Sequence, residues 1–146
     1  MITPVYPEPD FRFREVDGRR QIFDQCRRRW VVLTPEEWVR QNTIRWMVMS
    51  LGYPSSLIAV ERELSLGELR KRFDIVIHDR KHQPWMMVEC KAPAVSLGES
   101  VLMQLLRYNL SIPVTYLMVT NGEECHVAQR DGMDLKWLSE LPKFPF

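Results

Sequence analysis

The stretch KRFDIVIHDRKHQPWMMVECKAP, residues 71–93, most constrains what this chain can fold into. It contains two runs rich in Ile, Val, Met and Phe, separated by a polar link that ends in Pro84. Apolar runs of this length on either side of a polar, proline-containing link are typical of two strands joined by a hairpin loop. We therefore expect antiparallel strands over residues 72–78 and 85–90.

Three charged side chains interrupt this apolar pattern: Asp74, Glu89 and Lys91. A lone charge within a strand core is costly, so Glu89 and Lys91 could simply form an ion pair. Because side chains alternate along a strand, residues 89 and 91 share one face while Cys90 takes the other. Asp74 on the neighbouring strand can join them. Two carboxylates on rigid strands suit Mg²⁺, and a lysine can orient the attacking water, so the residues indicate metal-assisted phosphodiester hydrolysis.

Local signals place the other elements. Asp17-Gly18 between alternating apolar residues predicts a hairpin. Thr34 with Glu37, and Ser96 with Glu99, have the spacing of helix capping boxes. In chain order the sequence predicts a hairpin over 11–23, a helix over 35–51, a strand over 55–64, the two strands above, a helix over 97–110, and strands over 114–122 and 124–132.

This order predicts the α/β class, with a mixed central β-sheet flanked by helices and an N-terminal β-hairpin. A strand that follows a helix that follows a strand is expected to pair in parallel with the first strand. A chain of 146 residues, 45% hydrophobic and 27% charged, is expected to form a single globular domain over 1–146. The N-terminus resembles no secretory signal and no apolar run reaches membrane-spanning length, so we expect a cytoplasmic protein without a membrane partner.

Asp74 followed by Glu89-Cys90-Lys91 resembles the D…(D/E)xK signature of the PD-(D/E)xK nuclease superfamily. Five stretches between about Ile22 and Glu123 resemble, in this order, the N-terminal nuclease domain of the type I restriction enzyme R subunit: LTPEEWVRQ, KRFDIVI, MMVECKAP, QLLRYN and LMVTNG. The resemblance implies a restriction-endonuclease-like core and an Mg²⁺-dependent DNA endonuclease, with Mn²⁺ as a substitute.

The resemblance also implies roles for individual residues. Asp74 and Glu89 match the metal-binding carboxylates of the superfamily, and the backbone carbonyl of Cys90 matches its third protein oxygen. Lys91 matches the catalytic lysine. The resemblance thus makes Asp74, Glu89 and Lys91 catalytic residues, together with the three residues described next, and it makes the Cys90 carbonyl a metal ligand only.

Three further residues match family positions, each with a structural alternative. Gln104 and Tyr108 match a Q-x-x-x-Y element, and their spacing puts them on one helix face. They could instead be a surface amide and a core aromatic. Glu37 matches an acid on the first helix that often completes the metal site, although its place in a capping box explains it equally well. Glu36 is a less favoured substitute.

A competing function rests on the segment from Arg12 to Arg29, which carries seven arginines although the net charge of the chain is only +1. Such a strip can follow a phosphate backbone. In this alternative the protein is a catalytically silent, nuclease-fold module for DNA binding or assembly, and the nucleic-acid-binding residues are Arg19, Arg20, Arg27, Arg28 and Arg29.

An R subunit also carries motors, but this sequence contains no G-x-x-x-x-G-K-[ST] phosphate loop. The sequence is therefore either a fragment of a longer polypeptide or a free-standing nuclease-like domain, and its Met1 start and unbroken capping and hairpin signals favour the free-standing domain. The sequence also contains no recognition-helix or zinc-finger pattern. We therefore expect the endonuclease to have no sequence specificity of its own. The expected partner is DNA, together with a protein that supplies specificity or translocation.

Overall fold

The computed structural model describes residues 1–146, except for the side chains of Leu66 and Tyr108. The described residues form two β-sheets and two α-helices, which is the α/β class that the sequence predicts. In chain order the elements are β1 (Phe13–Val16), β2 (Arg19–Asp24), β3 (Arg29–Val32), α1 (Pro35–Met49), a 3₁₀ turn (Ser55–Leu57), β4 (Ile58–Leu66), β5 (Leu69–His78), β6 (Pro84–Cys90), α2 (Glu99–Asn109), β7 (Tyr116–Thr120), β8 (Cys125–Asp131) and β9 (Asp134–Trp137).

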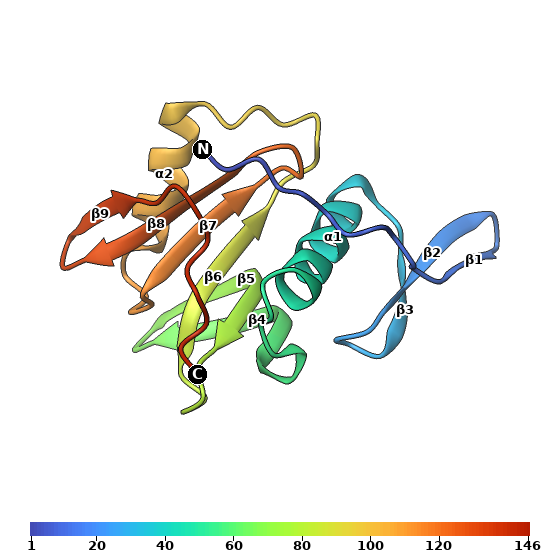
Figure 1. Ribbon diagram of the computed structural model, residues 1–146, viewed down its shortest axis with the longest axis horizontal. Helices are drawn as coiled ribbons and strands as arrows, with labels where there is room; N and C mark the ends of the chain where they lie inside the picture. Colours follow the sequence, from blue (N-terminus) through green and yellow to red (C-terminus); the bar gives the residue numbers. More distant parts are fainter.

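The central sheet is mixed, as predicted. Its strands lie in the order β4-β5-β6-β7-β8-β9 (Figure 1). Strands β6 and β7 pair in parallel, whereas the other described neighbours pair antiparallel. Helix α2 connects β6 to β7, which confirms the predicted parallel crossover. The candidate catalytic strands β5 and β6 therefore lie inside the sheet, with a paired strand on each side.

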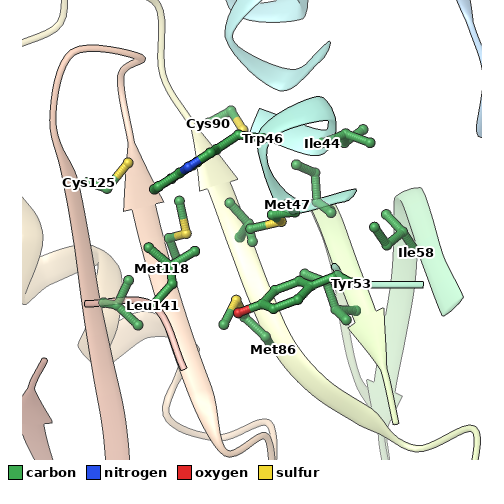
Figure 2. Close-up of a cluster of buried hydrophobic side chains, with 14 of the residues drawn as sticks. Ile44, Trp46, Met47, Tyr53, Ile58, Met86, Cys90, Met118, Cys125 and Leu141 are labelled. Atoms are coloured by element: carbon green, nitrogen blue, oxygen red, sulfur yellow. The ribbon is translucent and has the colours of Figure 1, made fainter. Parts of the chain in front are cut away.

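The two helices cover opposite faces of this sheet. Helix α1 contributes Trp46 and Met47 to a core that also contains Tyr53, Met86 and Met118 (Figure 2). The other face is covered by α2, and its buried residues include Phe73, Val76, Met87, Leu102 and Leu106. Neither helix of the described chain is both long and apolar enough to cross a membrane.

The C-terminal segment runs across the α1 side of the sheet (Figure 1). Phe144 is buried there and packs against Trp85, with ring centroids 5.5 Å apart. The hydroxyl of Tyr53 donates a 2.5 Å hydrogen bond to the carbonyl of Pro142. The tail is thus part of the core on this face.

The N-terminal hairpin is confirmed, and it is part of a three-stranded sheet. Val16 pairs with Arg19 across a two-residue turn in which Asp17 and Gly18 have φ angles of 53° and 74°. Positive φ at both central residues is what a type I′ turn requires, and it explains the Asp-Gly pair. Strand β3 was not predicted; it pairs with β2 and completes a three-stranded sheet on the far side of α1 from the central sheet (Figure 1).

Helix α1 begins as predicted, because the side chain of Thr34 accepts a 3.0 Å hydrogen bond from the backbone N–H of Glu37. The predicted cap of the second helix is wrong: Gly98 precedes α2, and Ser96 lies outside it. Strand β9 was also missed. It pairs with β8 across the two-residue turn Gly132-Met133, in which Gly132 has a φ of 63°, so Gly132 was the signal.

Candidate functional site

The candidate site lies where β5 and β6 stop pairing. Their backbone register ends at Ile75 opposite Val88. One residue further on, Oδ2 of Asp74 accepts a 2.7 Å hydrogen bond from the backbone N–H of Cys90. On its other edge β6 keeps its partner, since Cys90 remains opposite Thr120 in β7. The carboxylate of Asp74 therefore accepts the hydrogen bond that a backbone carbonyl of β5 would otherwise accept from Cys90.

An irregularity in β4 lies beside the same point. Val60 pairs with Ile75 and Arg62 pairs with Phe73, which puts Glu61 opposite Asp74. Glu61 has a φ of 52°, in the left-handed region that non-glycine residues rarely adopt. Strained backbone of this kind concentrates at functional sites. No sequence pattern marked Glu61.

Glu89 and Lys91 line a cleft of about 340 Å³ on the α2 side of the sheet. The cleft is lined by Arg70, Lys71, Arg72, Phe73, Glu89, Lys91, Leu105 and Asn109. Burial and the neighbouring charge of Asp74 together raise the pKa of the Glu89 carboxyl to about 7, against the opposing effect of Lys91. The structure therefore brings Asp74, Glu89 and Lys91 together.

Lys71 is a second lysine of this cleft, and sequence reasoning missed it. Its Nζ donates a 2.7 Å hydrogen bond to Oδ1 of Asn109 on α2, and only 7% of the residue is exposed. Burial lowers the pKa of Lys71 to about 8, while the charge of Glu89 acts in the opposite direction. Lysine and arginine side chains thus surround the acidic centre on this side.

Glu37 takes part in the cap of helix α1 as expected, because its backbone N–H donates to the side chain of Thr34. Its carboxylate, which was expected to complete either the capping box or the metal site, instead accepts hydrogen bonds from arginines. Oε1 of Glu37 accepts hydrogen bonds from Arg27 (2.6 Å) and Arg40 (3.0 Å), and Oε2 accepts one from Gln41 (3.2 Å). The carboxylate of Glu36, the less favoured substitute, lies 3.8 Å from Arg40.

Arg40 connects Glu37 to the candidate metal ligand Asp74. Its Nη2 lies 2.8 Å from Oδ1 of Asp74 while its Nη1 binds Glu37, and the residue is only 6% exposed. Arg27, from the turn after β2, also binds Asp24 and Glu61. We call this set the arginine network: Asp24, Arg27, Glu37, Arg40, Glu61 and Asp74. The i, i+3 spacing of Glu37 and Arg40 was its one local signal.

The five arginines predicted to bind nucleic acid fall into two groups. Arg19, Arg20, Arg28 and Arg29 are exposed on the N-terminal sheet or its turns. Arg27 belongs to the arginine network, where its side chain is 13% exposed. The structure thus leaves four of the five open to solvent.

Of the two candidate residues on α2, Gln104 is exposed, and the described residues of α2 that line the cleft are Leu105 and Asn109. The side chain of Tyr108 lies outside the described residues. Gln104 is thus not among the described residues that line this cleft.

The donor set fits a divalent cation held partly by water. Oδ1 of Asp74 accepts from Arg40 and Oδ2 accepts from the Cys90 backbone N–H, and the Glu89 carboxyl lies within hydrogen-bond reach of Asp74, so the two carboxylates are close enough to share one ion. In a strand the N–H and C=O of one residue point to the same side, which directs the Cys90 carbonyl toward Asp74. Among the described side chains, no three His, Cys, Asp or Glu residues are grouped to hold a metal. Asp74, Glu89, the Cys90 carbonyl and water would hold it.

The acids around the site have cationic partners within the protein. The guanidiniums of Arg27 and Arg40 face the carboxylates of the arginine network, Arg72 lies 3.5 Å from Glu61, and Lys71 and Lys91 are the cations beside Glu89. The fit of a divalent ion therefore rests on the oxygen donors of Asp74, Glu89 and Cys90 rather than on excess negative charge.

Comparison with protein families identifies the chain. The family model for the type I restriction enzyme R protein N terminus matches residues 35–145. The chain belongs to this family. No curated protein matches the chain. The part that matches the R protein N terminus begins with α1 and contains Asp74, Glu89 and Lys91 as well as Glu37 and Arg40, so the predicted resemblance is confirmed.

Proposed function

We propose that this member of the R protein N-terminus family is an Mg²⁺-dependent DNA endonuclease without intrinsic sequence specificity. The observation that carries the proposal is the meeting of Asp74, Glu89 and Lys91 where β5 and β6 separate, beside a cleft lined with basic residues. The family membership supports a relation to nucleases. Mn²⁺ is proposed as a substitute metal, and DNA and a protein that supplies specificity as partners.

Each residue has a definite part in the proposed reaction. Asp74 and Glu89, with the Cys90 carbonyl, would hold the ion, which when bound supplies charge stabilisation at phosphorus and a more acidic water. Lys91 lines the same cleft as Glu89 and would orient the attacking water and contact the scissile phosphate. Arg70, Lys71 and Arg72 would attract the DNA backbone to the cleft. Gln104 and Tyr108 remain predicted participants on α2.

Nicking of supercoiled plasmid in Mg²⁺ tests the proposal. We expect the wild-type protein to nick plasmid DNA, and we expect the variants Asp74→Ala and Lys91→Ala to lose this activity with their fold intact by circular dichroism. Arg45→Ala is the matched control, because Arg45 binds Asp10 at 2.6 Å on the part of α1 away from the cleft. Absence of nicking by folded wild-type protein across Mg²⁺ and Mn²⁺ concentrations would refute the proposal.

The alternative function, a catalytically silent module for DNA binding or assembly, is favoured by one observation. Arg19, Arg20, Arg28 and Arg29 are exposed on the N-terminal sheet, where their charge is accessible to a phosphate backbone. This alternative predicts DNA binding that weakens steeply with salt. Binding would survive Lys91→Ala and fail when the four arginines are replaced together by Gln.

A further inference from the structure

The guanidinium of Arg40 lies next to the proposed metal ligands. We infer that Arg40 is a built-in cation that takes the place of a second metal ion, so that the site binds a single divalent ion, at Asp74 and Glu89. The inference rests on the function proposed above. Arg40 contacts Asp74 with one terminal nitrogen (2.8 Å) and Glu37 with the other (3.0 Å), which is the bridging position between the two carboxylates.

Glu37 is the acid that would complete a second metal site, and its carboxylate is already in use. Its Oε1 accepts two guanidinium hydrogen bonds, from Arg27 at 2.6 Å and Arg40 at 3.0 Å. A carboxylate oxygen offers about two acceptor positions, so Oε1 is saturated. Oε2 accepts from Gln41 at 3.2 Å. A metal bound by Oε1, the oxygen that contacts Arg40, would therefore have to displace one of the two guanidiniums.

Arg40 cannot make room for a second metal ion by losing its charge. A guanidinium stays protonated in proteins, and a buried ion pair is costly to break. Arg40 is 6% exposed and lies near two further carboxylates, with Glu61 at 3.7 Å and Glu36 at 3.8 Å. These contacts hold its positive charge beside Asp74 at every metal concentration.

Solvent nevertheless reaches this place. A groove of about 560 Å³ on the α1 side is lined by Val31, Val32, Thr34, Pro35, Glu36, Glu37, Arg40, Glu61 and Ala92. An ion could therefore enter from the groove if the guanidinium were removed. Two-metal sites use ions about 3.5–4 Å apart that share a carboxylate. Without Arg40, Asp74 and Glu37 would offer a shared site of this kind.

Counting bound Mn²⁺ tests the inference without relying on cleavage. The free ion is measured by electron paramagnetic resonance as Mn²⁺ is titrated into the protein, and Asp74→Asn sets the background of surface binding. We expect one bound ion for the wild type, two for Arg40→Ala, and one for Arg40→Lys, which keeps the charge. Arg45→Ala, the control on α1, should bind one ion.

Two ions on the wild-type protein would overturn the inference and leave the proposed nuclease function standing. An unchanged count and affinity in Arg40→Ala would overturn it as well. No site-specific Mn²⁺ on the wild type would refute the proposed metal site, and the inference with it. If Arg40→Ala does not fold, Glu37→Gln is measured in its place. The number of bound Mn²⁺ ions should then stay at one. An affinity for Mn²⁺ at least tenfold weaker would make Glu37 a metal ligand and contradict the inference.

Discussion

Nη2 of Arg27 lies 2.6 Å from Oε1 of Glu37, the oxygen atom that also accepts a hydrogen bond from Arg40. A residue of the N-terminal sheet thus reaches the candidate site through one shared carboxylate oxygen. Arg27 also binds Asp24, which is fully buried. The N-terminal sheet is therefore joined to α1 by charge as well as by the chain.

Replacing Arg27 by Ala should destabilise the protein strongly. The carboxylates of Asp24 and Glu37 would remain buried with a partner removed, and breaking a buried ion pair in this way costs about 3–5 kcal/mol. Urea unfolding measures the free-energy change. Arg29→Ala is the control, because Arg29 is exposed, and it should change stability by less than about 0.5 kcal/mol. Equal losses for the two variants would contradict the buried role of Arg27.

Glu89→Gln should stabilise the metal-free protein at alkaline pH. Burial and Asp74 raise the pKa of Glu89 from 4.5 to about 7, so the fold favours the protonated carboxyl. Its contribution to stability is full below pH 4.5 and is lost as the pH rises to about 7, a difference of about 3 kcal/mol. Glutamine is neutral at every pH and avoids this loss.

Thermal unfolding in EDTA at pH 5 and pH 8 measures this effect. Wild type and Glu89→Gln should have similar Tm values at pH 5, and the variant should have the higher Tm at pH 8. A variant that is less stable than the wild type at pH 8 would show that Glu89 is held ionised by partners in the fold.

Mg²⁺ should stabilise the wild-type fold. An ion that binds the folded state alone, at a hundredfold excess over its Kd, adds about 2.7 kcal/mol of stability. For a chain of 146 residues this raises Tm by roughly 10 °C. Differential scanning fluorimetry with and without Mg²⁺ measures the shift at pH 8.

Two variants separate metal binding from catalysis in that experiment. Asp74→Asn removes a proposed ligand charge and should abolish the Mg²⁺ shift. Lys91→Ala leaves both carboxylates and should keep the shift while losing cleavage. If Lys91→Ala also lost the shift, Lys91 would be needed for the metal site itself.

The sequence predicted the elements whose signals are local. The capping pair of Thr34 and Glu37 marked the start of α1, Asp17-Gly18 marked the first turn, and two apolar runs joined by a polar link located β5 and β6. The predicted hairpin also placed Asp74 on the strand next to Glu89, and side-chain alternation placed Glu89 and Lys91 on one face without tertiary information. The short strands β3 and β9, of four residues each, carry too few residues for a periodic signal.

The arginine network was not predictable in the same way. Arg27 and Glu61 are separated by 34 residues, and so are Arg40 and Asp74. Nothing in a local pattern says which arginine of the run from Arg27 to Arg29 turns inward, because the tertiary position of the buried acids decides it. The sequence therefore predicted Arg27 as one of five nucleic-acid contacts, although the fold surrounds it with carboxylates.

The C-terminal tail offers a change that affects stability away from the site. Phe144 is 5% exposed and packs on Tyr53 and Trp85, so Phe144→Ala should cost about 3–5 kcal/mol in urea unfolding. Phe146, which is 78% exposed, is the matched control, and Phe146→Ala should cost less than about 1 kcal/mol. Because neither ring lines the cleft of Glu89 and Lys91, both folded variants should bind Mn²⁺ with the wild-type affinity. A weaker affinity in folded Phe144→Ala would instead mean that the core under α1 sets the position of the metal ligands.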